Sequence, residues 1–250
     1  MIYSSASQKG GVGKTTTSIT IAAGLAHKGK KALLVDMDSQ ANSSKVLLHD
    51  YKNIRPEDTV YRTIIKREPL PIYPSSSVPG LDIVPSHIFL AETDTSLASA
   101  TDHREARLKR ELDKVKVDYD TIILDCPPSL GWLTLNAFTA SDQIIIVVEP
   151  GYFELDSITQ IIRTIKTVQS EFNPKLVLRG ILLNKSDQTL ATTESVSLLQ
   201  QMYPDLFLPI IIPRNTDVKN AHYQKEDIFT YNAKASAALA YEKLVQEVFL

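Results

Sequence analysis

Cysteine is almost absent from this chain: Cys126 is the only one among 250 residues. An internal disulfide is therefore impossible, and a metal cluster held by thiolates is not expected. Long apolar runs are also missing, since none approaches the roughly 20 residues that span a bilayer. The formal net charge is only −2, so bulk charge does not indicate nucleic-acid binding, and any such contact would need a local patch. The five histidines are widely separated and form no metal-ligand pair.

What remains is the composition of an ordinary globular protein, with 43% hydrophobic and 22% charged residues. A length of 250 residues suits one large α/β domain. We expect residues 1–250 to form a single domain, because the chain enters its first strand at once. That start leaves no room for a signal peptide or for an N-terminal helix-turn-helix domain. With so little cysteine, a reducing cytoplasmic setting fits.

Strand-like and helix-like patterns alternate along the chain, which predicts a mostly parallel central sheet with helices on both faces. Short apolar runs predict strands at 1–3, 31–36, 81–84, 121–125, 144–148, 176–183 and 208–212. Helical spacing predicts helices at 14–29, 58–66, from about 87, 103–115, 155–171, 192–202 and 238–248. Most of the segment 51–80 is expected to be irregular, because it contains several prolines.

A phosphate-binding loop follows the first strand and reads Lys9-Gly10-Gly11-Val12-Gly13-Lys14-Thr15-Thr16. Its glycines allow several backbone N–H groups to point at one anion, and the helix that follows adds its positive end. Lys14 can reach the β- and γ-phosphates, and the Thr15 hydroxyl can hold Mg²⁺. The strict form of the motif also has a glycine at the start of the loop, and this chain has none there.

Lys9 is a second lysine in this loop, which an ordinary phosphate loop does not need. From the outer edge it could reach a nucleotide held by another copy of the chain, which would place the nucleotide in a dimer interface. The stretch from Lys9 to Thr16 resembles the deviant Walker A motif of the ParA/MinD group of P-loop ATPases. In that group the corresponding lysine contacts the nucleotide of the partner subunit, so the resemblance gives Lys9, with Lys14, a catalytic role.

Acidic residues follow two predicted strands, where ligands of parallel sheets lie. Asp36 and Asp38 end one strand, and Asp125 ends another before Cys126-Pro127-Pro128-Ser129-Leu130-Gly131. Asp36 and Asp125 are candidate Mg²⁺ ligands. In the family, the aspartate that matches Asp38 positions the hydrolytic water. The plainer alternative for Asp36 and Asp38 is a helix N-cap and an Asx turn. Cys126 is expected to be a small buried residue.

Two later segments concern the base of the nucleotide. Asn184-Lys185-Ser186-Asp187 matches the N-K-x-D pattern that specifies guanine in GTPases, yet an asparagine at a strand end also fits the base-contacting position of ParA and MinD relatives. We favour adenine and keep guanine as the alternative. Pro213-Arg214-Asn215 resembles the I-P-R-N segment at the base-binding end of the family's site.

The resemblance covers nearly the whole chain and implies a short ParA-type partition ATPase, similar to Soj, with ATP and Mg²⁺ as cofactors. Such proteins form an ATP-sandwich homodimer, bind DNA non-specifically on the nucleoid, and are released when a ParB-like partner stimulates weak ATP hydrolysis. The cargo is a plasmid or a chromosome, or in some relatives a carboxysome. A MinD-like membrane regulator is a further alternative, but the tail 246–250 lacks the basic amphipathic helix expected there. The nitrogenase iron-protein type would need more cysteines.

The expected DNA-binding surface is where the chain departs from this family. Soj-like members carry an arginine just after the position of Asp187 and another shortly after the I-P-R-N segment. The matching positions here hold Gln188 or Thr189, and Asp217. Because DNA binding is mostly electrostatic, other cations must supply it if it persists. The candidates are Lys185, Lys219 and Lys225, with Lys234 less favoured, and each could equally be a solvated surface lysine.

Overall fold

A computed structural model describes residues 1–151 and 154–250. The strands are β1 (Ile2–Ala6), β2 (Ala32–Asp36), β3 (Tyr73–Pro74), β4 (Leu81–Val84), β5 (Thr121–Asp125), β6 (Gln143–Val148), β7 (Val177–Ser186) and β8 (Phe207–Pro213). The α-helices are α1 (Lys14–His27), α2 (Asn42–Leu47), α3 (Thr93–Ala98), α4 (Arg107–Val115), α5 (Trp132–Ala140), α6 (Glu154–Glu171), α7 (Leu190–Met202), α8 (Thr216–Tyr223), α9 (Ile228–Asn232) and α10 (Ser236–Leu244). Short 3₁₀ or π turns lie at Tyr51–Asn53, Pro56–Asp58, Arg62–Lys66, Ile88–Glu92, Lys116–Asp118 and Val245–Phe249.

The strands form one sheet in the order β3-β4-β2-β5-β1-β6-β7-β8. Every neighbouring pair is parallel except β3 with β4, which is antiparallel. The short β3 lies at the edge, where Pro74 costs the sheet no inner hydrogen bond. The predicted α/β fold with a mostly parallel sheet is confirmed. The carboxyl ends of the central parallel strands consequently share one edge, which is where ligands bind in such sheets.

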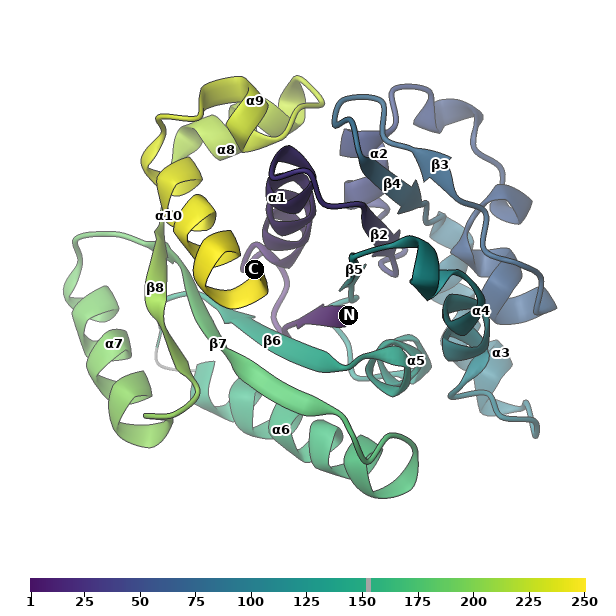
Figure 1. Ribbon diagram of the computed structural model, residues 1–250. Coiled ribbons are helices and arrows are strands. Elements are labelled where there is room, and N and C mark those ends of the chain that lie inside the picture. The colour runs from purple at the N-terminus through teal and green to yellow at the C-terminus, as the bar shows by residue number, and fades with distance from the viewer. Residues whose placement is uncertain (152–153) are drawn as a thin grey trace.

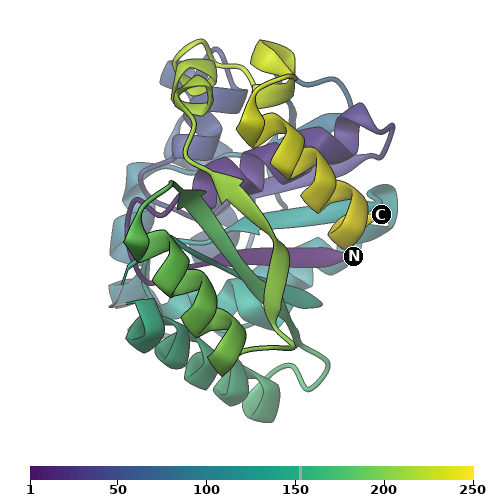
Figure 2. The same ribbon diagram turned by 90° about the vertical axis from the view of Figure 1, so that its left-hand side faces the viewer.

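Helices cover both faces of this sheet (Figure 1). On one face α1 and α10 pack with α2 against a buried cluster that includes Leu34, Ile123 and Leu182. On the other face α5 and α6 pack against a cluster that includes Leu33, Leu124 and Leu183. Successive residues of a strand belong to opposite clusters, as the alternation of side chains in a strand requires. Figure 2 shows the edge strand β8 with α7 nearby and α10 behind it.

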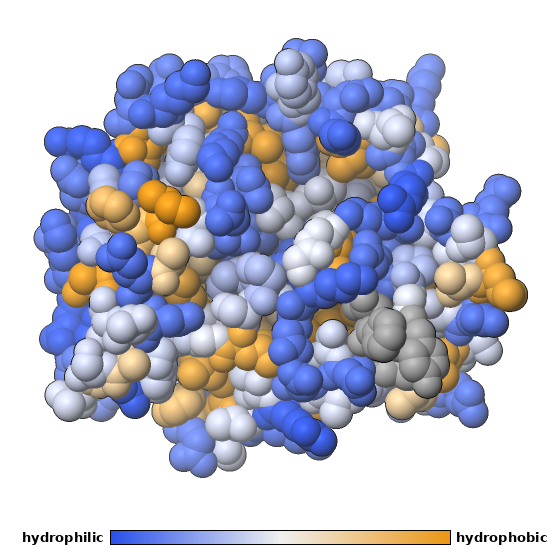
Figure 3. All heavy atoms as spheres, turned by 180° about the vertical axis from the view of Figure 1, so that it is seen from behind, coloured by the Kyte–Doolittle hydropathy of each residue, from blue (hydrophilic) through white to orange (hydrophobic). Residues whose placement is uncertain are grey.

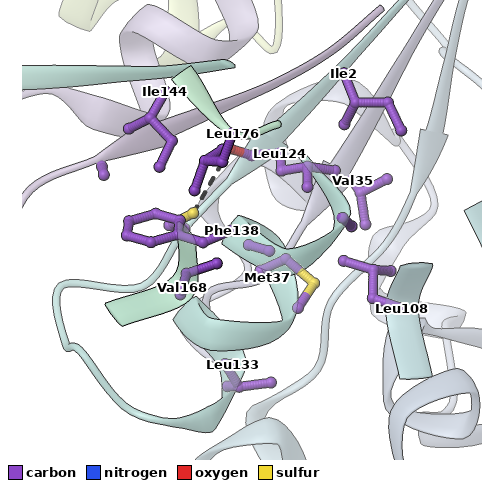
Figure 4. Packing of buried hydrophobic residues seen from close by; sticks show 14 of the residues in the cluster. Ile2, Val35, Met37, Leu108, Leu124, Leu133, Phe138, Ile144, Val168 and Leu176 are labelled. Atoms are coloured by element: carbon purple, nitrogen blue, oxygen red, sulfur yellow. Dashed lines mark hydrogen bonds between the residues drawn. The ribbon is translucent and has the colours of Figure 1, made fainter. Parts of the chain in front are cut away.

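The core beneath α5 is drawn in Figure 4, where Phe138 and Leu133 of that helix lie among side chains from several strands and helices. Cys126 belongs to this cluster and is 1% exposed. Burial raises the pKa of its thiol to about 12, which keeps it protonated. The expectation of a small buried cysteine is therefore confirmed, and its Sγ lies 3.9 Å from the carbonyl oxygen of Leu124.

Some elements differ from the sequence-based expectation. No helical period marks α5 in the sequence, because most of its residues are buried and apolar side chains surround the helix. The short helices α2, α8 and α9 were also missed, since few residues leave little periodicity to detect. The expected helix at 58–66 is helical over residues 60–66, mostly as a π-helix at Arg62–Lys66. In the family-like tail, α10 ends at Leu244 and a π turn continues to Phe249.

Figure 3 shows the molecule from behind, and there hydrophobic residues form separate small groups among hydrophilic ones. In the part of the chain that the structure describes, we found no helix long and apolar enough to span a membrane. The two chain ends lie close together in Figure 1, and the ring of Phe249 packs 4.7 Å from that of Tyr3, measured between centroids. The apolar tail therefore contacts the first strand of the sheet.

An ion pair joins α1 to the start of α9. The Asp227 carboxylate is fully buried and caps α9 by accepting the N–H groups of Phe229 at 2.8 Å and Thr230 at 3.2 Å. Its Oδ2 also lies 3.2 Å from Nε2 of His27, the last residue of α1. The hydrogen bond to Asp227 raises the pKa of His27 above its ordinary value of 6.5.

We expect His27→Gln to destabilise the protein more at pH 6 than at pH 8.5. A raised pKa in the folded state means that protonated His27 stabilises the fold fully below the unfolded pKa of 6.5. This contribution is lost as pH rises through the folded pKa. Urea unfolding of wild type and variant at both pH values measures it, with exposed His49→Gln as the control. A stability difference that is equal at the two pH values would contradict the prediction.

Candidate nucleotide-binding site

The phosphate loop connects β1 to α1 through residues 7–13. Gly11 and Gly13 have φ angles of +83° and +95°, a left-handed conformation that residues with a side chain rarely adopt. Gly13 precedes α1 and no side chain caps this helix. The first N–H groups of α1 therefore remain available to an anion at the positive end of the helix.

Two lysines of this loop occupy different places. Lys14 is only 6% exposed and lines a cavity of about 470 Å³ together with Thr15, Asp38 and glycines of the loop. The Lys9 side chain is 47% exposed, and its Nζ lies 2.7 Å from Oε1 of Glu149, just after β6. The inner lysine is thus placed to contact phosphates held in the same subunit, whereas the outer one lies near the surface.

Two aspartates lie side by side at the ends of neighbouring strands. Asp36 on β2 is the register partner of Asp125 on β5, and both residues are fully buried. Asp125 accepts hydrogen bonds from the hydroxyls of Ser18 at 3.2 Å and Ser43 at 2.7 Å, and Thr15 also bonds to it. Burial raises the pKa of both carboxyls, and for Asp36 the charge of Asp125 adds to this effect.

This donor set suits Mg²⁺ better than a transition metal. The described residues contain no group of three or more His, Cys, Asp or Glu side chains that could hold a metal ion. Mg²⁺ usually takes one or two protein oxygens and completes its shell with waters and phosphate oxygens. The Thr15 hydroxyl and the Asp125 carboxylate provide such oxygens beside the loop, and a cation there would offset the cost of burying the two carboxylates.

Asp36 and Asp38 are partly engaged by their own segment. Oδ2 of Asp36 accepts the N–H of Ser44 at 2.9 Å and its hydroxyl at 2.7 Å, while Oδ1 accepts the N–H of Asp38 at 3.1 Å. Oδ1 of Asp38 accepts the N–H of Gln40 at 2.9 Å, which forms the Asx turn considered above. Asp38 nevertheless lines the phosphate cavity. Asp38 therefore both forms a turn and faces the phosphate cavity.

Residues at the end of β7 hold the phosphate loop from the other side. Nδ2 of Asn184 donates to the carbonyl oxygen of Val12 at 2.9 Å, and Nζ of Lys185 donates to that of Gly11. A Cβ on Gly13 would collide with the Asn184 amide. From the sequence, we expected Asn184 to contact the nucleotide base and Lys185 to contact DNA. In the structure both side chains contact the loop, and Lys185 also lines the phosphate cavity.

A second cavity of about 420 Å³ adjoins the first, and Thr16, Lys185 and His222 line both. The two cavities therefore adjoin at the carboxyl edge of the sheet, and together they are called the groove. The predicted base-binding residues are gathered in the second cavity, whose lining includes Asn184, Ile212, Pro213, Arg214, Asn215, Val218 and Tyr241. A groove with a phosphate loop at one end and a partly apolar chamber at the other fits a nucleotide.

Comparison with known proteins agrees with this geometry. A family model described as an AAA domain matches residues 1–178. The chain is 38% identical to the sporulation initiation inhibitor protein Soj of Bacillus subtilis, over 96% of this chain and 95% of that protein. It is 34% identical to the chromosome partitioning protein ParA of Caulobacter vibrioides, over 97% of this chain and 91% of that protein. The chain belongs to the ParA/Soj family of partition ATPases.

A solved structure extends the likeness to the ligand. The cobyrinic acid a,c-diamide synthase of Mycobacterium smegmatis, with bound ATP analog and magnesium, superposes with a TM-score of 0.83 at 31% identity. The match covers 98% of this chain and 92% of that protein. The chain is thus an ATP-binding protein of the ParA/Soj family, whose fold also holds an ATP analog and Mg²⁺ in this relative.

The structure favours adenine over guanine in this ParA/Soj member. The carboxylate that would read guanine in an N-K-x-D motif is that of Asp187. Its Oδ1 instead accepts hydrogen bonds from the hydroxyls of Thr189 at 2.5 Å and Thr192 at 2.9 Å, at the start of α7. Asp187 is exposed and is not part of the lining described for the base cavity. A carboxylate committed to a helix terminus is poorly placed to pair with the base.

The lysines predicted to bind DNA differ in their surroundings. Lys219 is exposed at the base cavity, and Lys234 is exposed between α9 and α10. Nζ of Lys225 donates to the carbonyl oxygen of His49 at 2.7 Å. Asp217, which stands where Soj-like members carry an arginine, accepts a hydrogen bond from Nδ2 of Asn232 at 2.8 Å and so ties α8 to α9.

Sequence reasoning missed four residues of the site. Ser43 and Ser44 of α2 satisfy the buried carboxylates, and Glu149 pairs with Lys9. His222 lines both cavities, although the sequence assigned none of the five histidines to the site. The two serines follow the Asp36 segment closely, so their spacing gave a weak signal. Nothing in the sequence indicated that His222 or Glu149 would reach the groove.

Proposed function

We propose that this ParA/Soj member forms a homodimer around ATP, binds DNA without sequence preference, and positions or segregates a plasmid or chromosome. A ParB-like partner would stimulate ATP hydrolysis and release the dimer from DNA. The observation that carries the proposal is the pair of lysines in one phosphate loop, with Lys14 buried in the groove and Lys9 exposed outside it. Residues 1–250 would act as one ATPase domain, in the cytoplasm and on the nucleoid.

The Lys9 side chain is 47% exposed, so a second subunit could reach it. Its bond to Glu149 is a partly exposed ion pair, and such pairs stabilise a protein by about 1 kcal/mol or less. A phosphate group of a partner's nucleotide offers more negative charge than one carboxylate. In the proposed dimer Lys9 would therefore exchange Glu149 for the partner's nucleotide, and dimerisation would depend on the presence of phosphate.

In the proposed function, each residue of the site has its own role in hydrolysis. Lys14 and the N–H groups of the loop balance the charge of the β- and γ-phosphates. Mg²⁺, held by Thr15 and Asp125, would neutralise developing charge on the phosphate oxygens. Asp38 would orient the attacking water. Asp36 is already engaged by Ser44, so its contribution to the ion would run through water and through the N–H of Asp38 that it fixes.

One observation keeps a second cargo class open. Asp217 supplies an anion where Soj-like relatives have a cation, and its bond to Asn232 gives it a structural purpose. A positioning ATPase for a cargo other than DNA, such as a carboxysome, would tolerate that exchange. The MinD-like alternative is less favoured, because Phe249 of the apolar tail packs on Tyr3 instead of presenting a basic amphipathic helix. Stable membrane association is therefore not part of the proposal.

Asp38→Ala should separate nucleotide binding from hydrolysis. The substitution leaves Lys14 and the loop in place but removes the carboxylate that orients water, so hydrolysis should fall by about two orders of magnitude. ATP binding should persist and trap a dimer. A phosphate-release assay together with light scattering measures both, with exposed Asp50→Ala as the control. Hydrolysis at the wild-type rate, or a monomer in saturating ATP, would refute the assigned role.

Lys9→Ala should bind nucleotide and fail to dimerise. Lys9 lies outside the cavity that holds Lys14, so its loss should leave the affinity of the monomer for ADP nearly unchanged. Light scattering with a non-hydrolysable ATP analogue compares the dimer fraction of wild type, Lys9→Ala and the exposed control Lys52→Ala. Equal dimer fractions in all three proteins would show that Lys9 does not act between subunits.

DNA binding should require ATP and should fall steeply with salt, because phosphate contacts release counterions. In gel shifts, the ATP-trapped Asp38→Ala dimer should bind DNA, and adding Lys219→Glu should weaken this binding. Lys175→Glu is the matched control, since this exposed lysine lies between α6 and β7, at the amino end of the strand. If the trapped dimer does not bind DNA even at low salt, the cargo is of another kind.

A further inference from the structure

His222 occupies the junction of the two cavities that form the groove. It lies in the last turn of α8, which follows the base-binding segment after β8. Only Thr16, Lys185 and His222 are shared by the linings given for the two cavities. If the phosphates occupy the cavity at the loop and the base occupies the other, the junction receives the middle of the nucleotide. That part consists of the ribose and the first phosphate.

We propose that the His222 imidazole contacts the nucleotide at this junction and takes up a proton when the nucleotide binds. The inference rests on the proposed occupancy of the groove by a nucleoside di- or triphosphate with its phosphates at the loop. A protonated imidazole donates a charge-assisted hydrogen bond to a phosphate or ribose oxygen. His222 is then a positioning contact for the substrate, and binding is coupled to pH in the neutral range.

The surroundings of the His222 ring support a role as a hydrogen-bond donor to a ligand. Among the described residues, no hydrogen bond from a ring nitrogen of His222 to another side chain or carbonyl was found, although the residue is partly buried. Its backbone carbonyl oxygen accepts the N–H of Lys225 at 3.1 Å and helps to close α8. A polar group in a cavity gains when a ligand completes its hydrogen bonds.

The charges around His222 keep the free imidazole neutral and make it sensitive to an anion. Burial lowers its pKa from the ordinary value, and the charge of Asp227, next to α9, opposes this only in part. The other charged residues that line the two cavities are Lys14 of α1, Asp38, Lys45 of α2, Lys185 of β7, Arg214 after β8 and Lys219 of α8. Most of them are cations. A bound nucleotide brings negative charge among them, which favours the protonated ring.

Calorimetry can measure the proton directly. Titration of Mg-ADP into the protein at pH 6.5, in two buffers with different ionisation enthalpies, gives the number of protons taken up per nucleotide. Saturating Mg²⁺ suppresses titration of the nucleotide itself. We expect proton uptake by wild type and by the control His103→Asn, whose side chain is 82% exposed. We expect His222→Gln to bind Mg-ADP about tenfold more weakly at pH 6.5, with little uptake. The difference in affinity should shrink at pH 8.5.

A second measurement does not depend on the variant. The ring resonances of His222 in wild type, assigned by their loss in His222→Gln or His222→Asn, should titrate at a higher pH with Mg-ADP than without it. Equal proton uptake by wild type and His222→Gln, or an unchanged ring titration on binding, would overturn the proposal while leaving nucleotide binding intact. If wild type does not bind Mg-ADP at all, the proposed function itself fails. The two failures are therefore distinguishable.

Discussion

The buried carboxyl groups of Asp36 and Asp125 constrain which residues can surround them and where the phosphate loop lies. Two adjacent strands end in register with a carboxylate each, and neither carboxylate reaches bulk water. Like charges at such a place are costly unless hydroxyls, N–H groups or cations surround them. The hydroxyls of Ser18, Ser43 and Ser44 donate hydrogen bonds to these carboxylates. The buried Lys14 adds a positive charge near Asp125. These contacts hold the start of α1 against β2 and β5. They therefore also fix the position of the phosphate loop.

The loop is held from its other side by β7. Asn184 and Lys185 donate to two of its carbonyl oxygens, and these contacts fix the backbone of the loop. Preorganised N–H groups bind a phosphate without first having to be ordered. Because β5 and β7 lie on opposite sides of β1 in the sheet, a nucleotide in the groove contacts groups that belong to both halves of the molecule. Binding can therefore affect surfaces on both halves.

Near the groove, Asp217 stands where Soj-like members carry an arginine, and here it has a packing role. Asp217 joins α8 to α9 through Asn232, and Asp227 joins α9 to α1 through His27. These two carboxylates fix the small helices that follow the base-binding segment, including α8, which carries His222 into the groove. In Figure 1, α8 and α9 lie at one end of α1, beside α10. A chain that uses an anion for this packing must place any cations for DNA elsewhere.

The sequence by itself determined the alternation of most strands and helices, the phosphate loop and the aspartates at strand ends. Each of these depends on local patterns: glycines that permit left-handed turns, and apolar runs that end in a polar residue. It also indicated the family through Lys9 to Thr16. Only the tertiary structure decided which groups meet across the sheet. Asn184 reaches Val12, Glu149 reaches Lys9, and His222 reaches the junction of two cavities. Those contacts join residues far apart in the chain, and their spacing in sequence carries no period that could reveal them.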